Sequence, residues 1–192
     1  MSDYVNWFVN DGQTNFYTHL LKNYTAKPVK CLQIGAYTGD ASLWLYNNVL
    51  THPDSQLVDI DTWEGSDEPV HHQMNWQTIE SLYDEKVKQG LKEKKITKFK
   101  GTSDKFFRSN NQKFDFIYVD GDHTAYGVLK DAVSAYECLE VGGIIAFDDY
   151  EWSAGLGAIK EPKIAIDAFS NVYSDRVQEI LKGYQRWFKK IG

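Results

Sequence analysis

A regular alternation of short apolar runs with longer amphipathic segments constrains the fold of this chain more than any other feature. The runs are Val29–Ile34, Gln56–Ile60, Ile96–Lys100, Phe114–Val119 and Ile144–Phe147. The segment Ala125–Leu139, between the last two runs, carries its apolar residues at the spacing of one helical face. Strands joined by helices of this length pair in parallel through crossover connections, so the pattern predicts an α/β fold.

Three further segments extend this prediction. Residues 176–181 and 184–191 flank Lys182-Gly183, which is typical of a β-hairpin with a tight turn. The polar connection 63–90 is long for a strand-to-helix link, and we expect it to hold a helix near residues 79–87 and to act as a lid or substrate wall. At 192 residues without a visible boundary, the chain is expected to form a single domain over residues 1–192.

Composition narrows the classes of function. The net charge of −6 argues against a nucleic-acid partner, which needs a basic surface. No apolar window of 18 residues occurs, so we expect no membrane partner, and the first 14 residues lack the pattern of a secretory signal. Cys31 and Cys138 lie far apart within apolar runs and are predicted to be free, buried thiols. These properties favour a cytoplasmic protein that acts on a small-molecule substrate.

Polar residues follow each of the first three predicted strands. The loop Gly35-Ala36-Tyr37-Thr38-Gly39 has the spacing G-x-x-x-G rather than the G-x-G-x-x-G of a dinucleotide site. Asp61 follows the second strand, where a carboxylate is suited to accept ribose hydroxyls, and Ser103-Asp104 follows the third, where a polar loop can reach an adenine edge. A glycine pair alone is also typical of a simple turn. Three polar strand ends in this order favour a nucleoside-binding site.

A second group of polar residues follows the fourth and fifth strands. It contains Asp120, Asp122 and His123, and then Asp148 and Asp149. The mutual repulsion of four neighbouring carboxylates costs free energy unless something offsets their charge. A hard divalent ion such as Mg²⁺ would offset it. The alternative is structural: the acid pair caps a loop, Asp122 caps the helix that begins near residue 124, and His123 is a buried structural histidine. The sequence leaves both interpretations open.

Two motifs carry a resemblance to a known family. Residues 60–67 read I-D-T-W-E-G-S-D and residues 120–123 read D-G-D-H. The chain resembles the class I S-adenosylmethionine-dependent methyltransferases over about residues 30–152, within the group that has I-D-T-W-x-G and D-G-x-H motifs. The resemblance implies a Rossmann-like, mostly parallel sheet of seven strands with a C-terminal antiparallel hairpin and helices on both faces.

The resemblance also implies a cofactor, S-adenosylmethionine, and the residues that bind it. The loop from Gly35 to Gly39 would line the methionine part, Asp61 the ribose, and Ser103-Asp104 the adenine. Gln33 stands where the family usually has an acid. The full implied cofactor-binding set is Gln33, Gly35, Ala36, Tyr37, Gly39, Asp61, Thr62, Trp63, Ser103, Asp104 and Asp120.

The acids after strands four and five resemble those of metal-dependent O-methyltransferases, of both the catechol and the sugar-modifying type. This resemblance implies metal ligation by Asp120, Asp148 and Asp149, with Asp122 or His123 as the general base. The function expected is O-methylation of a small-molecule hydroxyl, on a sugar or a phenol, with help from a divalent metal. The alternative is a non-catalytic module that binds S-adenosylmethionine or a nucleoside, which only Gln33 favours. A nicotinamide-dependent oxidoreductase is disfavoured by the missing G-x-G-x-x-G.

Overall fold

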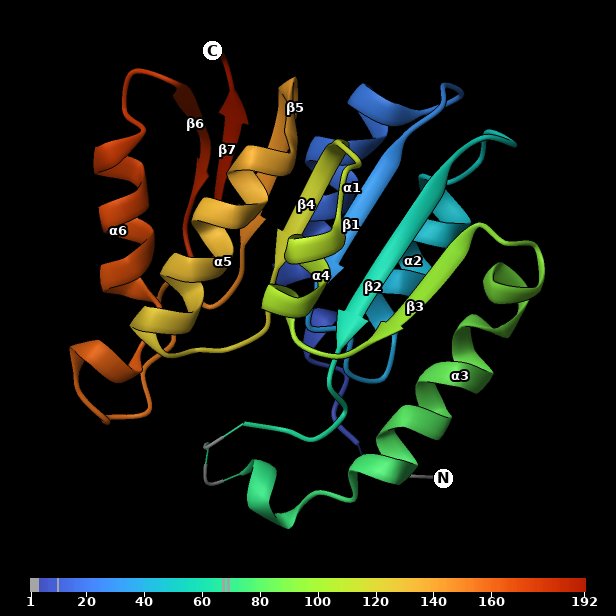
Figure 1. Ribbon diagram of the computed structural model, residues 1–192, viewed down its shortest axis with the longest axis horizontal. Helices are drawn as coiled ribbons and strands as arrows, with labels where there is room; N and C mark the ends of the chain where they lie inside the picture. The colour runs from blue at the N-terminus through green and yellow to red at the C-terminus, as the bar shows by residue number, and fades with distance from the viewer. Residues whose placement is uncertain (1–3, 10, 67, 69) are drawn as a thin grey trace.

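The computed structural model of the chain describes residues 4–9, 11–66, 68 and 70–192. Its centre is one seven-stranded sheet in the order β3-β2-β1-β4-β5-β7-β6 (Figure 1). The pairs among β1 to β5 are parallel, and β7 is antiparallel to both β5 and β6. The strands are β1 (Lys30–Ile34), β2 (Gln56–Asp61), β3 (Ile96–Lys100), β4 (Phe114–Val119), β5 (Leu139–Phe147), β6 (Val177–Lys182) and β7 (Arg186–Lys190).

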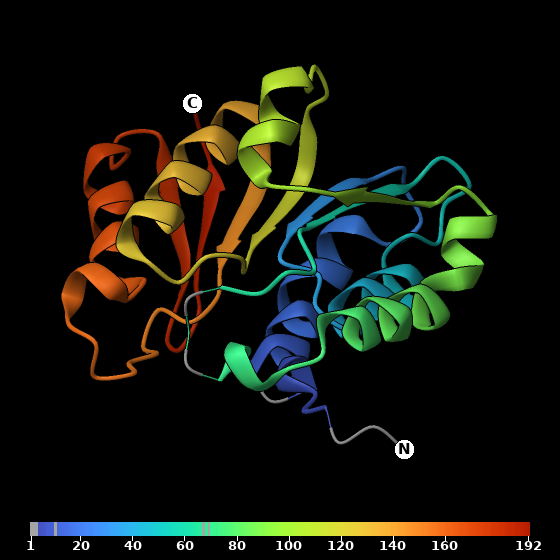
Figure 2. The same cartoon turned by 60° about the horizontal axis from the view of Figure 1, so that its bottom comes forward.

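Helices cover both faces of the sheet (Figure 2). One face packs against α1, α2 and α3 in a core that includes Phe16, Leu45 and Tyr83. The other packs against α4, α5 and α6 in a second core that includes Ala132 and Phe169. The helices are α1 (Asp11–Tyr24), α2 (Asp40–Asn48), α3 (Trp76–Lys92), α4 (Ser103–Ser109), α5 (Ala125–Cys138) and α6 (Lys163–Val172), with short 3-10 turns η1 (Trp7–Val9), η2 (His71–Gln73) and η3 (Ala158–Lys160).

This architecture confirms the predicted fold, a mostly parallel class I methyltransferase sheet closed by an antiparallel hairpin. One strand differs in extent from the prediction. We expected it to begin at Ile144 after a turn at Gly142-Gly143, but β5 begins at Leu139, directly after α5. The ladder with β4 shifts register between Phe114 and Phe116, where Gly142 adopts a φ of +87°. Glycine takes this backbone conformation without steric cost, so the strand bulges instead of breaking.

The connection between β2 and β3 divides into two parts. Its first part, up to η2, lies beyond the carboxyl edge of the sheet (Figure 1). Its second part is α3, which buries Ile79, Tyr83 and Val87 in the core and does not stand away from the sheet. Asp67, the acid that ends the I-D-T-W motif, lies outside the described residues. Among those described, no helix combines the length and the apolar character needed to cross a bilayer.

Candidate functional site

A cavity of about 1120 Å³ opens at the carboxyl edge of the parallel strands. Ligand pockets typically measure about 300–1000 Å³, so this one has room for two ligands side by side. Gly39 and Trp63 are not among the described residues that line it. The predicted residues that do line it are Gln33, Gly35, Ala36, Tyr37, Asp61, Thr62, Ser103, Asp104, Asp120, Asp122, His123, Asp148 and Asp149.

The loop after β1 is shaped by contacts within the protein. Gly35 has a φ of +87°, and a Cβ there would lie 1.8 Å from the carbonyl oxygen of Asp120. Gly39 caps α2 with a φ of +81°, and a Cβ there would lie 2.9 Å from the ring of Tyr83. Both glycines are therefore required by close approach of neighbouring protein atoms. They let the loop follow the carboxyl edge of β1 closely along the cavity.

Asp61 at the end of β2 fixes this loop. One carboxylate oxygen accepts the backbone N–H groups of Ala36 at 2.8 Å and Tyr37 at 2.9 Å. The other accepts the N–H of Trp63 at 2.7 Å. A carboxylate has about four acceptor positions, so about one remains for a ligand. The predicted ribose-binding residue thus also positions the backbone that surrounds the cavity.

Trp63 lies in the core beneath the loop, although the resemblance implied a place in the cofactor site. Its side chain is buried, and its indole N–H donates to the carbonyl oxygen of Tyr37 at 3.0 Å. Its ring packs against Tyr83 at a centroid distance of 4.8 Å and under the Lys98 ammonium at 4.6 Å. Trp63 therefore supports the cavity wall from behind.

The surroundings of Gln33 explain why this position holds a neutral amide and not an acid. In the β1–β2 ladder Gln33 pairs with Asp59, a fully buried carboxyl whose pKa burial raises to about 7. The Gln33 amide donates to the Gly35 carbonyl at 2.9 Å and accepts from Ser42 at 3.2 Å. An acid at position 33 would set a second negative charge beside Asp59 in the core, which is costly.

The two acids near the end of β3 have different surroundings. Asp104 forms ion pairs with Arg108 at 2.6 Å and with Lys130 at 3.0 Å. Asp131, which sequence reasoning missed, is buried on α5 and accepts the Ser103 hydroxyl at 2.5 Å. The sequence did contain a signal for Asp131. This residue falls on the apolar face of a predicted helix, where a carboxylate is unusual and can indicate a site.

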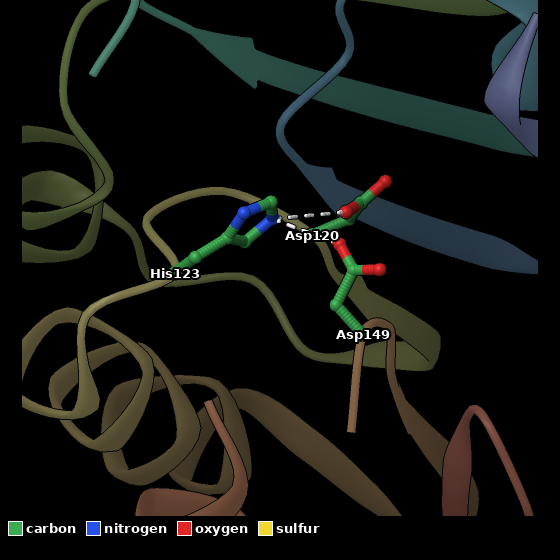
Figure 3. A group of neighbouring side chains, drawn as sticks. All are labelled: Asp120, His123 and Asp149. Carbon is green, nitrogen blue, oxygen red and sulfur yellow. Dashed lines mark ion pairs between the residues drawn. The ribbon is translucent and has the colours of Figure 1, made fainter. Parts of the chain in front are cut away.

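Three side chains at the ends of β4 and β5 converge in the cavity (Figure 3). His123 Nε2 lies 3.0 Å from Asp149 Oδ2 and 3.8 Å from Asp120 Oδ1. One ligand atom from each of Asp120, His123 and Asp149 lies within 4.8 Å of the others. Burial raises the pKa of Asp120 well above its usual range, and the neighbouring charges of Asp148 and Asp149 add to this rise.

His123 carries the positive charge of this group. Burial alone would lower its pKa, but Asp120, Asp149 and Glu68 together raise it to about 12. Its Nδ1 lies 3.1 Å from Glu68 Oε1, without an aligned hydrogen bond to any described residue. The ring also lies 5.1 Å from that of Trp152. Sequence reasoning gave Glu68 no part near His123, because a polar connection offers no spacing that singles out one acid.

Asp148, one of the three predicted metal ligands, turns toward the C-terminal hairpin. It accepts the hydroxyl of Tyr118, the Gln185 amide at 3.0 Å and the N–H of Asp149 at 2.9 Å. Burial, and then the charge of Asp149, raises its pKa to about 6. These bonds hold the turn in which Asp149 takes a φ of +55°. Asp148 therefore orients Asp149, while His123 takes the third place in the convergent group.

Asp122, the other candidate for the general base, is exposed and engaged locally. Its carboxylate accepts the N–H of Thr124 at 2.8 Å and the Thr124 hydroxyl at 3.0 Å. Thr124 in turn caps α5 by accepting the N–H of Gly127. Of the two candidates, His123 alone belongs to the convergent group.

The convergent group fits a divalent cation in its chemistry. Two carboxylates and an imidazole are donors that such ions accept, and they lie close enough to share one ion. Burial, and then the charges of Asp148 and Asp149, raise the pKa of Asp120, and a bound cation would favour its charged form.

Comparisons with known proteins identify the family of this domain. The family described as "Methyltransferase domain" matches residues 32–150. No curated protein sequence matches the chain. Among solved structures, the S-adenosylhomocysteine-bound methyltransferase PaMTH1 of Podospora anserina has a TM-score of 0.61 at 17% identity, over 86% of this chain and 73% of its own.

Two other solved structures are of enzymes that are named for methylating different kinds of atom, oxygen and nitrogen. The O-methyltransferase TomG of Streptomyces achromogenes, in complex with S-adenosylmethionine, has a TM-score of 0.60 at 15% identity, over 85% of this chain and 73% of its own. The N-methyltransferase NodS of Bradyrhizobium japonicum has a TM-score of 0.63 at 14% identity, over 97% and 98%. At these identities the likeness concerns the fold. The family match spans more than half of the chain, which therefore belongs to the methyltransferase domain family, with the class I S-adenosylmethionine-dependent fold.

Proposed function

We propose that this protein binds S-adenosylmethionine and transfers its methyl group to a hydroxyl of a small molecule, a sugar or a phenol, with a divalent cation held by Asp120 and Asp149. The convergence of Asp120, His123 and Asp149 on one point of the cavity is the observation that carries the proposal. Such a set supplies both a cation site and a proton acceptor, which methylation of a weakly acidic hydroxyl needs.

A smaller cavity of about 260 Å³, which shares residues with the main one, offers a place for the acceptor. Most of its lining side chains are polar: Ser66, Glu68, Asp122, His123, Thr124, Leu156 and Lys160. The surface that these residues present to the cavity is nevertheless mostly apolar. Polar groups set in an apolar wall suit an acceptor that has both a ring face and hydroxyl groups, as a sugar or a phenol does. Trp152 beside His123 offers an aromatic face to such a ring.

The chain's own groups then have defined tasks. When bound, S-adenosylmethionine supplies a methyl group on a sulfonium, and the cation supplies positive charge beside the acceptor oxygen. The loop Gly35–Gly39 and Asp61 hold the cofactor, and the remaining lining residues orient the acceptor. With the cation held by Asp120 and Asp149 alone, the lone pair of His123 Nε2 stays free, and this nitrogen takes the hydroxyl proton as the new O–C bond forms and the S–C bond breaks. His123 is neutral, as a base must be, once another positive charge offsets Asp120 and Asp149.

The structure removes the reason for the alternative function, a non-catalytic binding module. Gln33, the residue that favoured it, is explained by the buried Asp59 beside it. The acids and the histidine that catalysis would use all line the cavity.

Calorimetric titration tests the proposal. We expect S-adenosylmethionine to bind, and Mg²⁺ to give a separate signal or to strengthen that binding. Asp149→Asn should lose the response to Mg²⁺ and keep cofactor binding, whereas Asp122→Asn, at an exposed neighbouring acid, should keep both. Formation of S-adenosylhomocysteine with a panel of polyols and phenols then identifies the acceptor class. A folded protein that binds no S-adenosylmethionine would refute the proposal.

A further inference from the structure

Gln185, in the turn before β7, is a buried amide to which the proposed chemistry gives no task. Only 1% of its surface is exposed, and it is not among the described residues that line either cavity. Its oxygen accepts an N–H of Asn15 and the indole N–H of Trp187, each at 2.9 Å. Its nitrogen donates to the Tyr118 hydroxyl at 3.1 Å and to Asp148 Oδ1 at 3.0 Å. Both lone pairs and both N–H groups of the amide are therefore used.

Trp187 fixes which way this amide faces. An indole nitrogen donates a hydrogen bond and cannot accept one, so the Gln185 oxygen has to point toward Trp187. The Trp187 ring is fully buried and packs on Phe16 and Phe116, which keeps it in place. The amide nitrogen then points toward Asp148, whose ionised carboxylate accepts hydrogen bonds and cannot donate them. The core of the protein thus determines the direction of this contact.

Asp148 transmits this orientation to the next residue. Its Oδ1 accepts both the Gln185 amide and, at 2.9 Å, the backbone N–H of Asp149, while its Oδ2 accepts the Tyr118 hydroxyl. Asp149 takes a φ of +55°, a conformation that persists in a residue other than glycine only where surrounding bonds hold it. In this conformation its Oδ2 lies 3.0 Å from His123 Nε2. The bonds of Asp148 therefore hold Asp149 in the convergent group.

We infer that Gln185 is a positioning residue of the divalent-cation site, which holds Asp148 and thereby keeps the Asp149 carboxylate beside Asp120. The inference rests on the cation of the proposed function. Loss of a hydrogen-bonding partner behind the metal ligands typically weakens metal binding by about 10- to 100-fold. Control of the cation site is thus assigned to the C-terminal hairpin, at a residue outside the cavity lining.

Calorimetric titration of the full chain with Mg²⁺, and separately with S-adenosylhomocysteine, tests this inference. Gln185→Met keeps the length of the side chain and removes its hydrogen bonds. It should weaken Mg²⁺ binding by about tenfold or more. Binding of S-adenosylhomocysteine should stay within about twofold, because the Gly35 loop and Asp61 lie at the ends of other strands. A general loss of folded structure would weaken both.

Two controls separate positioning from stability. Asn15→Ala removes a donor from the far side of the same amide and leaves Trp187 to direct it, so Mg²⁺ affinity should be kept. Gly142→Ala should also keep it, because that glycine lies near the opposite end of β5 from Asp149. If Gln185→Met does not fold, Gln185→Glu decides the point at pH 8. Its carboxylate still accepts from Trp187 but sets an acceptor against Asp148, and it should lose Mg²⁺ affinity selectively.

The pathway through Asp148 is tested by combining variants. Gln185→Met with Asp148→Asn should bind Mg²⁺ about as well as the weaker single variant, because both act on the same turn. Fully additive losses, a loss in Asn15→Ala as large as in Gln185→Met, or parental Mg²⁺ affinity in the folded Gln185 variant would each overturn this inference alone. A parent protein that binds S-adenosylhomocysteine but not Mg²⁺ would overturn the cation of the proposed function together with this inference.

Discussion

At the scale of single residues, Asp59 is an acid in the core whose charge the fold opposes. Asp59 is fully buried on β2, where the Tyr83 hydroxyl donates to one oxygen at 2.8 Å and the other has no hydrogen-bond partner among the described residues. The negative charge of Asp61 adds to this opposition, and the neighbouring Lys98 on β3 forms its ion pairs with Glu80 and Asp84. Burial is the main cause that raises the Asp59 pKa to about 7.

This carboxyl makes stability depend on pH. Its folded pKa lies above its unfolded value of about 3.9, so its neutral form favours folding. The contribution is complete below about pH 4 and declines as the pH rises through about 7, by about 2–3 kcal/mol between pH 5 and pH 8. Asp59→Asn should flatten the slope of unfolding free energy against pH in this window. Urea denaturation at several pH values measures it, and equal slopes in parent and variant would contradict the assignment.

At the scale of elements, the contact between the ends of β1 and β4 fixes where the cavity begins. Gly35 N–H donates to the Ile60 carbonyl at 2.8 Å and Asp120 N–H to the Ile34 carbonyl at 2.8 Å, so the three strand ends form one ladder. The missing side chain at Gly35 lets this ladder close against the Asp120 carbonyl.

A pair of glycine substitutions tests this contact. Gly35→Ala combines a positive φ with a contact of 1.8 Å to backbone and should lower the unfolding free energy by about 3 kcal/mol or more. Gly142→Ala has the same φ of +87° but open space around it, and should cost only about 1–2 kcal/mol. Denaturant titration of both variants gives the comparison. Equal losses would mean that backbone conformation, and not the close approach, is the reason for Gly35.

At the scale of the whole molecule, the C-terminal hairpin connects the sheet edge to the site. Trp187 on β7 is fully buried and packs on Phe16 of α1 and Phe116 of β4, each at 5.6 Å between ring centroids. Gln185 accepts the Trp187 indole N–H at 2.9 Å and donates to Asp148 at 3.0 Å. Asp148 in turn holds the N–H of Asp149. The last strand of the chain thereby orients a residue of the convergent group.

Two tryptophan variants measure the hairpin's contribution. Trp187→Ala should lower the unfolding free energy by about 3–5 kcal/mol, the usual cost of emptying an aromatic core position. Trp7→Ala, at a half-exposed ring stacked on Tyr37, should cost less than about 1 kcal/mol. Thermal and urea unfolding of the two variants provide the comparison. Similar losses would show that the hairpin is not integral to the core.

The order of strands and helices along the chain, the hairpin and the edge of the sheet that holds the site could all be predicted from local sequence patterns. Apolar periodicity depends on neighbours along the chain, and the carboxyl ends of parallel strands meet at one edge in any such fold. This reasoning placed the Gly35 loop, Asp61, Asp120 and His123 at one cavity.

What each side chain does at that cavity depends on contacts in the folded protein. Trp63 supports it from the core, Asp148 faces the hairpin and Asp122 holds the start of α5, although their sequence positions resemble those of binding residues. Glu68 and Asp131 join the site from a polar connection and a helix face. Side-chain direction is set by hydrogen bonds and packing between segments distant in sequence, and no local pattern encodes those contacts.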